Sequence, residues 1–291
     1  MFTTLISAEH LMVQLKSQLT ANHVVIVDCR HDLMDAPAGK NAYDAGHIPG
    51  AVFANLDQDL SGSKFDAAGV FGGRHPLPAT ADLLAALRRL GINQDTQVVA
   101  YDGHGGMYAA RLWWLLRSIG HAQVAVLDGG IAAWIGAGQV LQTETANNVL
   151  GNIDVKESLT KQVNVQTVLQ NLQASAPTKL QVIDARAPDR FRGENETMDP
   201  IGGHIPGARN RFFKDNLQAD GRFKSAQELR QDWQGLLEDP AKAIMQCGSG
   251  VTACHNLLAL EIAGLSGAAL YPGSWSEWCS DASRPVATGV I

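Results

Sequence analysis

The stretch that decides the fold reads Ala243-Ile244-Met245-Gln246-Cys247-Gly248-Ser249-Gly250-Val251-Thr252-Ala253. Its apolar start predicts a strand, and leucine and isoleucine residues after it recur at roughly helical spacing up to Gly264. Cys247 is therefore expected at the carboxyl end of a strand, facing the N-terminus of a helix. Ligands bind at such a place in an open α/β sheet, because loop N–H groups and the helix dipole converge there.

The loop that follows Cys247 suits an anionic sulfur. Gly248 and Gly250 let successive backbone N–H groups turn inward as a nest for an anion. A cysteine in such a nest ionises readily, because its thiolate is the anion that the nest stabilises. We therefore predict that Cys247 is a nucleophile. The alternative is a buried core cysteine in a glycine-rich turn.

Composition limits the function classes. The chain has 291 residues, of which 45% are hydrophobic and 18% charged, as in a soluble globular protein with room for two domains. A net charge of −6 argues against a nucleic-acid partner. No basic, apolar leader and no run of twenty apolar residues are present, so we expect no membrane association and a cytoplasmic location.

The four cysteines, Cys29, Cys247, Cys254 and Cys279, form no Cys-x-x-Cys pair. They are too few for a disulfide scaffold, which is consistent with a reducing compartment. A structural zinc site is not expected, and we predict neither a metal nor a cofactor.

The sequence contains two copies of the same pattern of motifs. An apolar run leads into Asp28-Cys29-Arg30, and another leads into Asp184-Ala185-Arg186. Both copies then carry Gly-His-Ile-Pro-Gly-Ala, at 46–51 and 203–208, and both end on a matching tryptophan motif, with Trp134 and Trp278 at an offset of 144. A unit this long indicates two homologous domains rather than stacked small repeats.

Strand-like and helix-like stretches alternate within the first copy. We expect strands at 24–27, 98–101 and 122–127, and helices at 81–90 with Thr80 as N-cap, at 109–119 and at 131–135. This alternation predicts an α/β fold in which each domain is a parallel sheet flanked by helices on both faces. The expected organisation is an inactive domain at 1–140, a polar linker at 141–160 and a catalytic domain at 161–291.

The duplication supplies an internal control. Residues present in both copies are expected to serve the fold, as with His47 and His204, each of which should tie its turn to neighbouring backbone. At the position of the Cys247 loop, the first copy has Asp102-Gly103-His104-Gly105-Gly106. This loop has no cysteine for thiolate chemistry, and we expect it to lack the cradle formed by the Gly-Ser-Gly-Val-Thr sequence.

Two Gly-His-Ile-Pro-Gly domains, each with Asp-x-Arg after its first strand, and a Cys-Gly-Ser-Gly-Val-Thr-Ala loop in the second only, resemble the tandem rhodanese-type sulfurtransferases. The resemblance covers nearly the whole chain. The loop is more similar to that of 3-mercaptopyruvate sulfurtransferases than to the loop of thiosulfate sulfurtransferases, which carries basic residues after the cysteine.

The resemblance implies a two-step transfer. Cys247 takes a sulfane sulfur from a small anionic donor, 3-mercaptopyruvate or thiosulfate, and passes it to cyanide or to a thiol, either a small one or a thioredoxin-like protein. Backbone groups of Gly248, Gly250, Val251 and Thr252 are expected to bind the substrate. The resemblance also implies a triad of Asp57, His75 and Ser249, although Ser249 could simply permit the turn and the other two lie in loops.

The donor requires a counter-charge. The family's donor-binding arginine matches Arg190, whose counterpart in the first copy is Met34. Arg192 is the competing candidate. The 3-mercaptopyruvate pattern has a second arginine nine positions beyond the first, where this chain has Asp199, so the preferred donor stays open.

Two other functions compete with sulfur transfer. A cysteine phosphatase needs an arginine six positions after its cysteine, where this chain has Ala253, and the loop is too uncharged for a dianion. The remaining alternative is a non-enzymatic module that carries a persulfide for a partner protein.

Overall fold

The computed structural model describes residues 1–17, 24–146 and 149–290, so positions 147 and 148 of the predicted linker lie outside the described residues. The chain forms two compact units whose segments interleave. The first comprises Met1–Gly62, Pro78–Leu159 and Leu217–Phe223, and the second Ser63–Leu77, Thr160–Asn216 and Lys224–Ile291. Each unit thus contains one short segment from the other sequence repeat.

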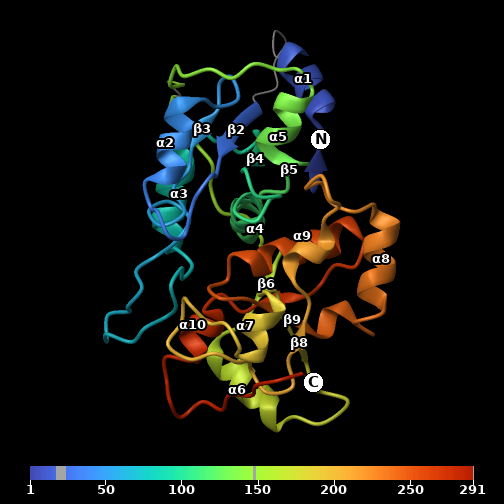
Figure 1. Cartoon of the computed structure of the whole chain (residues 1–291). Coiled ribbons are helices and arrows are strands. Elements are labelled where there is room, and N and C mark those ends of the chain that lie inside the picture. The colour runs from blue at the N-terminus through green and yellow to red at the C-terminus, as the bar shows by residue number, and fades with distance from the viewer. Residues whose placement is uncertain (18–23, 147–148, 291) are drawn as a thin grey trace. The chain divides into compact units, whose positions relative to one another are not determined.

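The first unit is built on a five-stranded parallel sheet with the strand order β1-β5-β4-β2-β3. Helices alternate with the strands, as the sequence predicts (Figure 1). Its elements are β1 (Leu5–Ile6), α1 (Ala8–Ser17), β2 (Val24–Asp28), α2 (Ala38–Ala45), β3 (Val52–Phe53), α3 (Thr80–Arg89), β4 (Gln97–Tyr101), α4 (Ala109–Ser118), β5 (Val124–Leu127) and α5 (Gly130–Gly136).

The second unit repeats this topology, with a five-stranded parallel sheet in the order β6-β10-β9-β7-β8. Its elements are β6 (Lys161–Gln162), α6 (Val165–Gln173), β7 (Gln181–Asp184), α7 (Pro188–Arg192), β8 (Arg209–Asn210), η2 (Phe213–Asn216), α8 (Ala226–Gln234), η3 (Pro240–Lys242), β9 (Ala243–Gln246), α9 (Thr252–Ile262), β10 (Ala269–Leu270) and α10 (Ser274–Trp278). The expected fold class is confirmed in both units.

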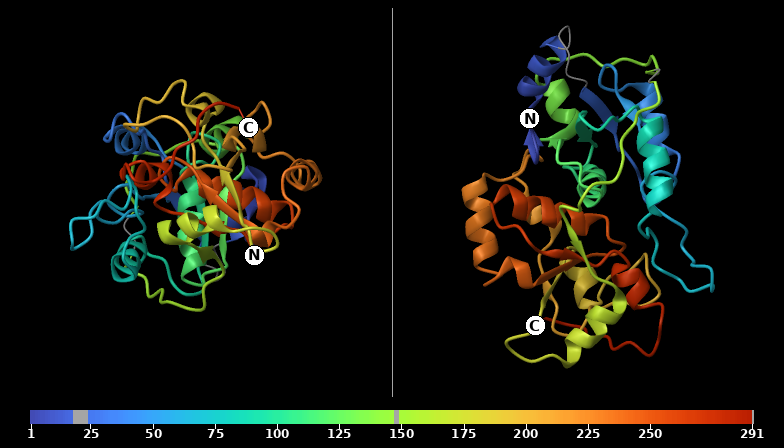
Figure 2. Two further views of the ribbon diagram at one scale, coloured as in Figure 1. Left: turned by 90° about the horizontal axis from the view of Figure 1, so that it is seen from below. Right: turned by 180° about the vertical axis from the view of Figure 1, so that it is seen from behind.

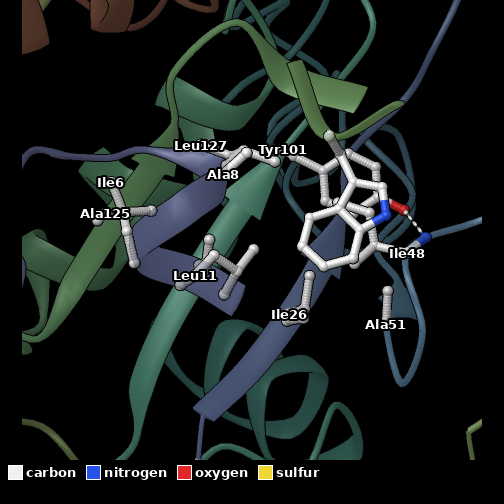
Figure 3. Packing of buried hydrophobic residues seen from close by; sticks show 11 residues of the cluster. Ile6, Ala8, Leu11, Ile26, Ile48, Ala51, Tyr101, Ala125 and Leu127 are labelled. Carbon is white, nitrogen blue, oxygen red and sulfur yellow. Dashed lines mark hydrogen bonds between the residues drawn. The ribbon is translucent and has the colours of Figure 1, made fainter. Parts of the chain in front are cut away.

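Both faces of the first sheet are buried. Helices α1 and α5 lie side by side in both views (Figures 1 and 2) and cover one face, where Leu11 packs with strand residues such as Ile26 and Leu127 (Figure 3). Tyr101 reaches from β4 across this face, and its hydroxyl accepts a hydrogen bond from the N–H of Ile48 (Figure 3). Helix α4 packs against β4 and β5, whose alternate side chains are also buried. Strands covered on both faces read as continuous apolar runs.

The second sheet is covered in the same way. Helices α6 and α10 enclose a core that includes Val168, Ile244 and the fully buried Trp275 and Trp278. Helix α9 contacts β9 and β10 and also packs against α8, beside which it lies in Figures 1 and 2. This arrangement fixes the end of β9, where Cys247 follows.

One helix start was predicted wrongly. Thr80 is the first residue of α3 and Ala79 is its N-cap, with no side-chain hydrogen bond to the cap. The other predicted helices and strands of the first copy are confirmed with shifts of one or two residues at their ends. Among the described residues, no helix is long and apolar enough to cross a membrane.

Candidate active site

Cys247 lies at the carboxyl end of β9, as predicted, and is only 2% exposed. Helix α10 also binds the backbone of Cys247 through hydrogen bonds. The N–H of Cys247 donates to Ser274 Oγ at 3.0 Å, and the N–H of Trp275 donates to the Cys247 carbonyl at 2.9 Å. The cysteine is therefore fixed by both a central strand and a helix.

The loop from Gly248 to Val251 connects Cys247 to α9, which begins at Thr252. Gly250 adopts a φ of +75°, and a Cβ at this position would collide with the carbonyl oxygen of Pro272, so both its conformation and its surroundings require glycine. The first N–H groups of α9 have no carbonyl partner within the helix. Five residues after the cysteine, the chain thus brings the positive end of a helix dipole to the loop.

Ser249 and His75 meet in the second unit. Ser249 Oγ and His75 Nδ1 are 2.8 Å apart, and each residue is 5% exposed. His75 belongs to the segment Ser63–Leu77, which is part of the second unit although it comes from the first sequence repeat. The structure therefore brings together two of the three residues of the expected triad.

Asp57, the third member, belongs to the first unit. There its Oδ2 lies 4.0 Å from Nε2 of the buried His31. Burial lowers the pKa of His31, against the effect of the Asp57 charge. The catalytic role of Asp57 stays a prediction.

Arg190 extends from α7 and is held by a buried carboxylate. Its Nε and Nη2 donate to Glu196 at 2.8–3.1 Å, and Glu196 also pairs with the buried Arg186 at 3.3 Å. Burial works to raise the pKa of Glu196, but hydrogen bonds from Arg190 and from the N–H of Met198 outweigh it and keep the pKa below its ordinary value. Glu196 is therefore an anion that orients Arg190. Arg192 pairs instead with the exposed Glu194.

A second arginine, Arg74, lies at the Cys247 loop and was not predicted from the sequence. Arg74 Nη1 forms an ion pair with Asp199 Oδ1, and Asp199 Oδ2 lies 3.3 Å from Arg190 Nη2. A Cβ placed on Gly248 would lie 2.6 Å from Arg74 Nη2. The sequence comparison of the two copies does not single out Arg74, because Gly73-Arg74-His75 parallels Gly221-Arg222-Phe223 and both copies have an arginine there.

The loop of the first unit does form a cradle, which corrects the expectation from its sequence. Asp102 occupies the position equivalent to Cys247, since the N–H of Ile131 donates to its carbonyl as that of Trp275 does to Cys247. The Asp102 carboxylate accepts four backbone N–H groups at 2.8–2.9 Å, from His104, Gly106, Tyr108 and Ala109. The cradle is present and is filled by the protein's own anion.

Residues shared by the two copies serve the fold, as predicted. Arg30 pairs with Asp28 and donates to the Gly46 carbonyl, and Arg186 repeats both bonds with Asp184 and Gly203. Each histidine of the Gly-His-Ile-Pro-Gly turns bonds backbone through Nδ1, His47 to Tyr43 and His204 to Phe191, both at 2.8 Å.

All four cysteines are free thiols in buried positions. Burial raises the pKa of Cys29 well above its ordinary value and raises the pKa of Cys279 to about 11. Cys254 donates its S–H to the Gly250 carbonyl at 3.3 Å. The surroundings of Cys29, Cys254 and Cys279 therefore fit structural cysteines rather than nucleophiles. Within the described part of the chain, no cluster of three metal-ligating side chains occurs.

Two parallel α/β units, with a loop cysteine in one and a carboxylate in its place in the other, define a protein of tandem rhodanese-like domains. The family model of the rhodanese-like domain matches residues 11–137 and 165–281. The chain belongs to this family and is a tandem-domain sulfurtransferase, an enzyme. The alternative of a non-enzymatic carrier is thereby set aside.

Similar proteins are named for either of two donors, 3-mercaptopyruvate or thiosulfate. The chain is 44% identical to a probable 3-mercaptopyruvate sulfurtransferase of Pseudomonas aeruginosa, over 95% of this chain and 96% of that one. It is 41% identical to a putative thiosulfate sulfurtransferase of Mycobacterium tuberculosis, over 91% of both chains. The solved structure of a 3-mercaptopyruvate sulfurtransferase from Leishmania major superposes with a TM-score of 0.82 at 28% identity, covering 98% of this chain and 76% of that chain.

Proposed function

We propose that the enzyme transfers a sulfane sulfur from 3-mercaptopyruvate or thiosulfate to a thiol or to cyanide through a persulfide on Cys247. The observation that carries this proposal is the placement of Cys247, which directly follows the buried strand β9 and lies just before a glycine-containing loop and the N-terminus of α9.

The first step forms an S–S bond at Cys247. The thiolate attacks the outer sulfur of the donor, and the bond from that sulfur to the rest of the donor breaks. From 3-mercaptopyruvate, the electron pair leaves with the carbon as the enolate of pyruvate, which takes up a proton. From thiosulfate, it leaves with sulfite.

The second step regenerates the enzyme. A thiolate or cyanide attacks the outer persulfide sulfur, and Cys247 departs as a thiolate with the electron pair of the broken bond. The loop N–H groups and the start of α9 stabilise negative charge on the sulfurs in both steps.

Four free cysteines in the chain agree with a reducing compartment such as the cytoplasm.

Ser249 and His75 supply a proton path. Their 2.8 Å separation allows the hydroxyl and the imidazole to share a hydrogen bond, and their burial shields it from water. The pair can accept the thiol proton of 3-mercaptopyruvate and return a proton to the departing enolate carbon. Thiosulfate has no such proton, so the pair favours 3-mercaptopyruvate.

Arg190 binds the anionic part of the donor. Glu196 fixes its Nε side, which leaves the other edge of the guanidinium directed to the loop, 3.7–3.8 Å from a Cβ placed on Gly248. A guanidinium offers paired donors in one plane and suits a carboxylate or a sulfonate. We expect a modest preference for 3-mercaptopyruvate, because the loop itself has no basic residue.

Mass spectrometry tests the persulfide. The intact chain incubated with 3-mercaptopyruvate should gain one sulfur atom, and peptide mapping should locate it on Cys247. Cys247→Ser should abolish both loading and turnover. Cys254→Ser, which keeps a donor for the Gly250 carbonyl, is the matched control and should load normally. Turnover by Cys247→Ser would refute the proposal.

A further inference from the structure

A cavity of about 410 Å³ lies within the second unit, at the carboxyl edge of its sheet. Its lining includes Gln162, where β6 ends, and Tyr271, which directly follows β10. Strand β10 runs parallel to both β6 and β9 and pairs with each of them. Ligands of open α/β sheets bind at this edge, and their pockets commonly measure about 300–1,000 Å³. The cavity therefore has the place and the size of a site for a small molecule.

Two segments that line the cavity also contact the Cys247 loop. Pro272 lines it, and the carbonyl oxygen of Pro272 is the atom with which a Cβ on Gly250 would collide. Pro76 lines it too and directly follows His75, whose Nδ1 is 2.8 Å from Ser249 Oγ. The residues proposed for sulfur transfer are not among those that line the cavity. The cavity is therefore next to the proposed reaction site without being part of it.

Glu277, on α10, is the one charged side chain among the residues that line the cavity. A Cβ on Gly273, another lining residue, would collide with Glu277 Oε2, so this oxygen lies against a wall of the cavity. The start of α6 borders the cavity at Asn164, but Asn164 caps the helix by accepting the Thr167 N–H at 3.0 Å. The carboxyl group therefore sets the charge of the cavity.

The Glu277 carboxyl group forms no ion pair with any residue that the structure describes. The neighbouring cation, Arg284, pairs with Asp281 instead, at 3.5 Å. Burial raises the pKa of Glu277, although Tyr271 and Arg284 act in the opposite direction. A partly buried carboxylate without an ion pair is unfavourable, and a cation beside it offsets that cost.

Tyr271 supplies a second polar group without a partner. The residue is fully buried, and its Oη has no hydrogen-bond partner within the described ranges. Glu277 lies close enough to raise the pKa of this hydroxyl further, although burial is the larger cause. At the offset of 144, the first copy has Leu127 and Ala133 in place of these two residues. The polar pair is thus specific to the copy that carries Cys247, and a buried unpaired hydroxyl calls for a hydrogen-bonding ligand or water.

We propose that this cavity is a second binding site, for a small organic cation that carries an ammonium group on a short apolar body. The ammonium group has three donors and no acceptor, which suits a carboxylate and a hydroxyl oxygen that both lack partners. It donates to Glu277 and to Tyr271 Oη, while the apolar body packs against lining side chains such as Leu77, Val163 and Pro272. This inference goes beyond sulfur transfer and does not depend on it.

Nuclear magnetic resonance titration of the ¹⁵N-labelled full chain tests the site, with benzylammonium as the probe. Benzyl alcohol is its neutral counterpart and benzoate its anionic one. Addition of benzylammonium should shift the backbone amide signals of Gly273 and Glu277. The wild type should bind it about tenfold or more tightly than benzyl alcohol, the effect of one charge-assisted interaction, and should bind benzoate least.

Three variants locate the cation. Glu277→Gln, which keeps the shape of the side chain, should weaken benzylammonium binding by about tenfold or more and change benzyl alcohol binding by less than about twofold. Tyr271→Phe should weaken benzylammonium binding by about two- to fivefold, the effect of losing one neutral hydrogen bond. Glu238→Gln is the matched control, because Glu238 is an exposed carboxylate of the same unit, and it should change the affinity by less than about twofold.

Each assignment has a result that would overturn it. Absence of shifts at Gly273 and Glu277 would remove the site, and benzyl alcohol or benzoate binding as tightly as benzylammonium would remove the cation class. Unchanged benzylammonium affinity in Glu277→Gln or Tyr271→Phe would remove that residue from the site. The comparison of the three probes uses the wild type alone, so it decides the class of ligand even where a variant does not fold. Persulfide formation on Cys247 is measured separately, so failure of the transfer chemistry is distinguishable from failure of cation binding.

Discussion

The Asp102 carboxylate accepts a hydrogen bond from the N–H of Tyr108 at 2.8 Å and holds the loop of the first unit closed. Three further N–H groups bind the same carboxylate, so the loop satisfies its own donors. The equivalent loop of the second unit has a sulfur at this point and begins its helix two residues earlier relative to it. One fold therefore yields a closed anion nest in one unit and a candidate reactive thiol in the other.

Replacing Asp102 should destabilise the first unit. Asp102→Ala leaves four N–H groups without their acceptor in a fully buried place, which should cost at least about 3 kcal/mol of unfolding free energy. Asp66→Ala is the matched control, because Asp66 also accepts two backbone N–H groups but is exposed, and it should cost less than about 1 kcal/mol. Urea unfolding of both variants measures the difference, and equal losses would contradict the interpretation.

Asp102→Cys should not create a second sulfur-loading site. The new thiol would have a cradle, but the position of Ser249 is taken by His104, and the counterpart of Arg190 is Met34, which is 82% exposed. A donor anion would thus lack its counter-charge. Donor incubation of the double variant Asp102→Cys, Cys247→Ser, followed by mass spectrometry, should find no added sulfur. Loading at a rate comparable to that of Cys247 would refute this explanation.

The features that depend on a short, continuous stretch of residues were predicted from the sequence. The apolar runs before Asp28 and Asp184 gave the central strands, and the Gly-Ser-Gly-Val-Thr sequence located the loop between β9 and α9. The comparison of the two copies correctly assigned Arg30 and Arg186 to the fold, where each binds backbone and a neighbouring aspartate.

The comparison of the two copies could not single out Arg74, because its counterpart in the second copy, Arg222, is also an arginine. The ion pair of Arg74 with Asp199 depends on a contact across 125 residues, which the local sequence does not show. The cradle around Asp102 was missed because its donors are backbone N–H groups, which no residue type reveals. Thr80 was misplaced by one residue because helix ends are set by geometry as well as by cap preference.

His75→Asn should lower kcat with 3-mercaptopyruvate by about 100-fold or more, the size of a general acid–base contribution. The amide keeps hydrogen bonding to Ser249 Oγ but cannot exchange a proton, so one limb of the pH profile of kcat should disappear. Ser249→Ala should cause a smaller loss. His121→Asn is the control, since His121 is a buried histidine bonded to the Thr96 carbonyl, and it should affect stability rather than the pH profile. An unchanged profile in His75→Asn would remove His75 from the proton path.

Glu196→Gln should lower the free energy of unfolding and should also reduce the dependence of that free energy on pH. Glu196 is 4% exposed and pairs with Arg186 and Arg190, so loss of its charge should cost about 3–5 kcal/mol. Burial opposes ionisation, but Arg190 and the backbone N–H groups of Met198 and Asp199 keep the pKa of Glu196 below its ordinary value in the folded state. Its contribution is therefore fully present above the unfolded pKa near 4.5 and is lost as the pH falls through the folded pKa.

The same substitution separates positioning of Arg190 from stability. With Glu196 neutral, the Arg190 side chain loses the partner that fixes its Nε edge, so KM for the donor should rise while kcat at saturation changes little. Urea unfolding of wild type and Glu196→Gln between pH 3 and 7 should show the two free-energy curves converging as the pH falls below 4.5, because protonated glutamate resembles glutamine. Curves that stay parallel over this range would show that the charge of Glu196 does not stabilise the fold.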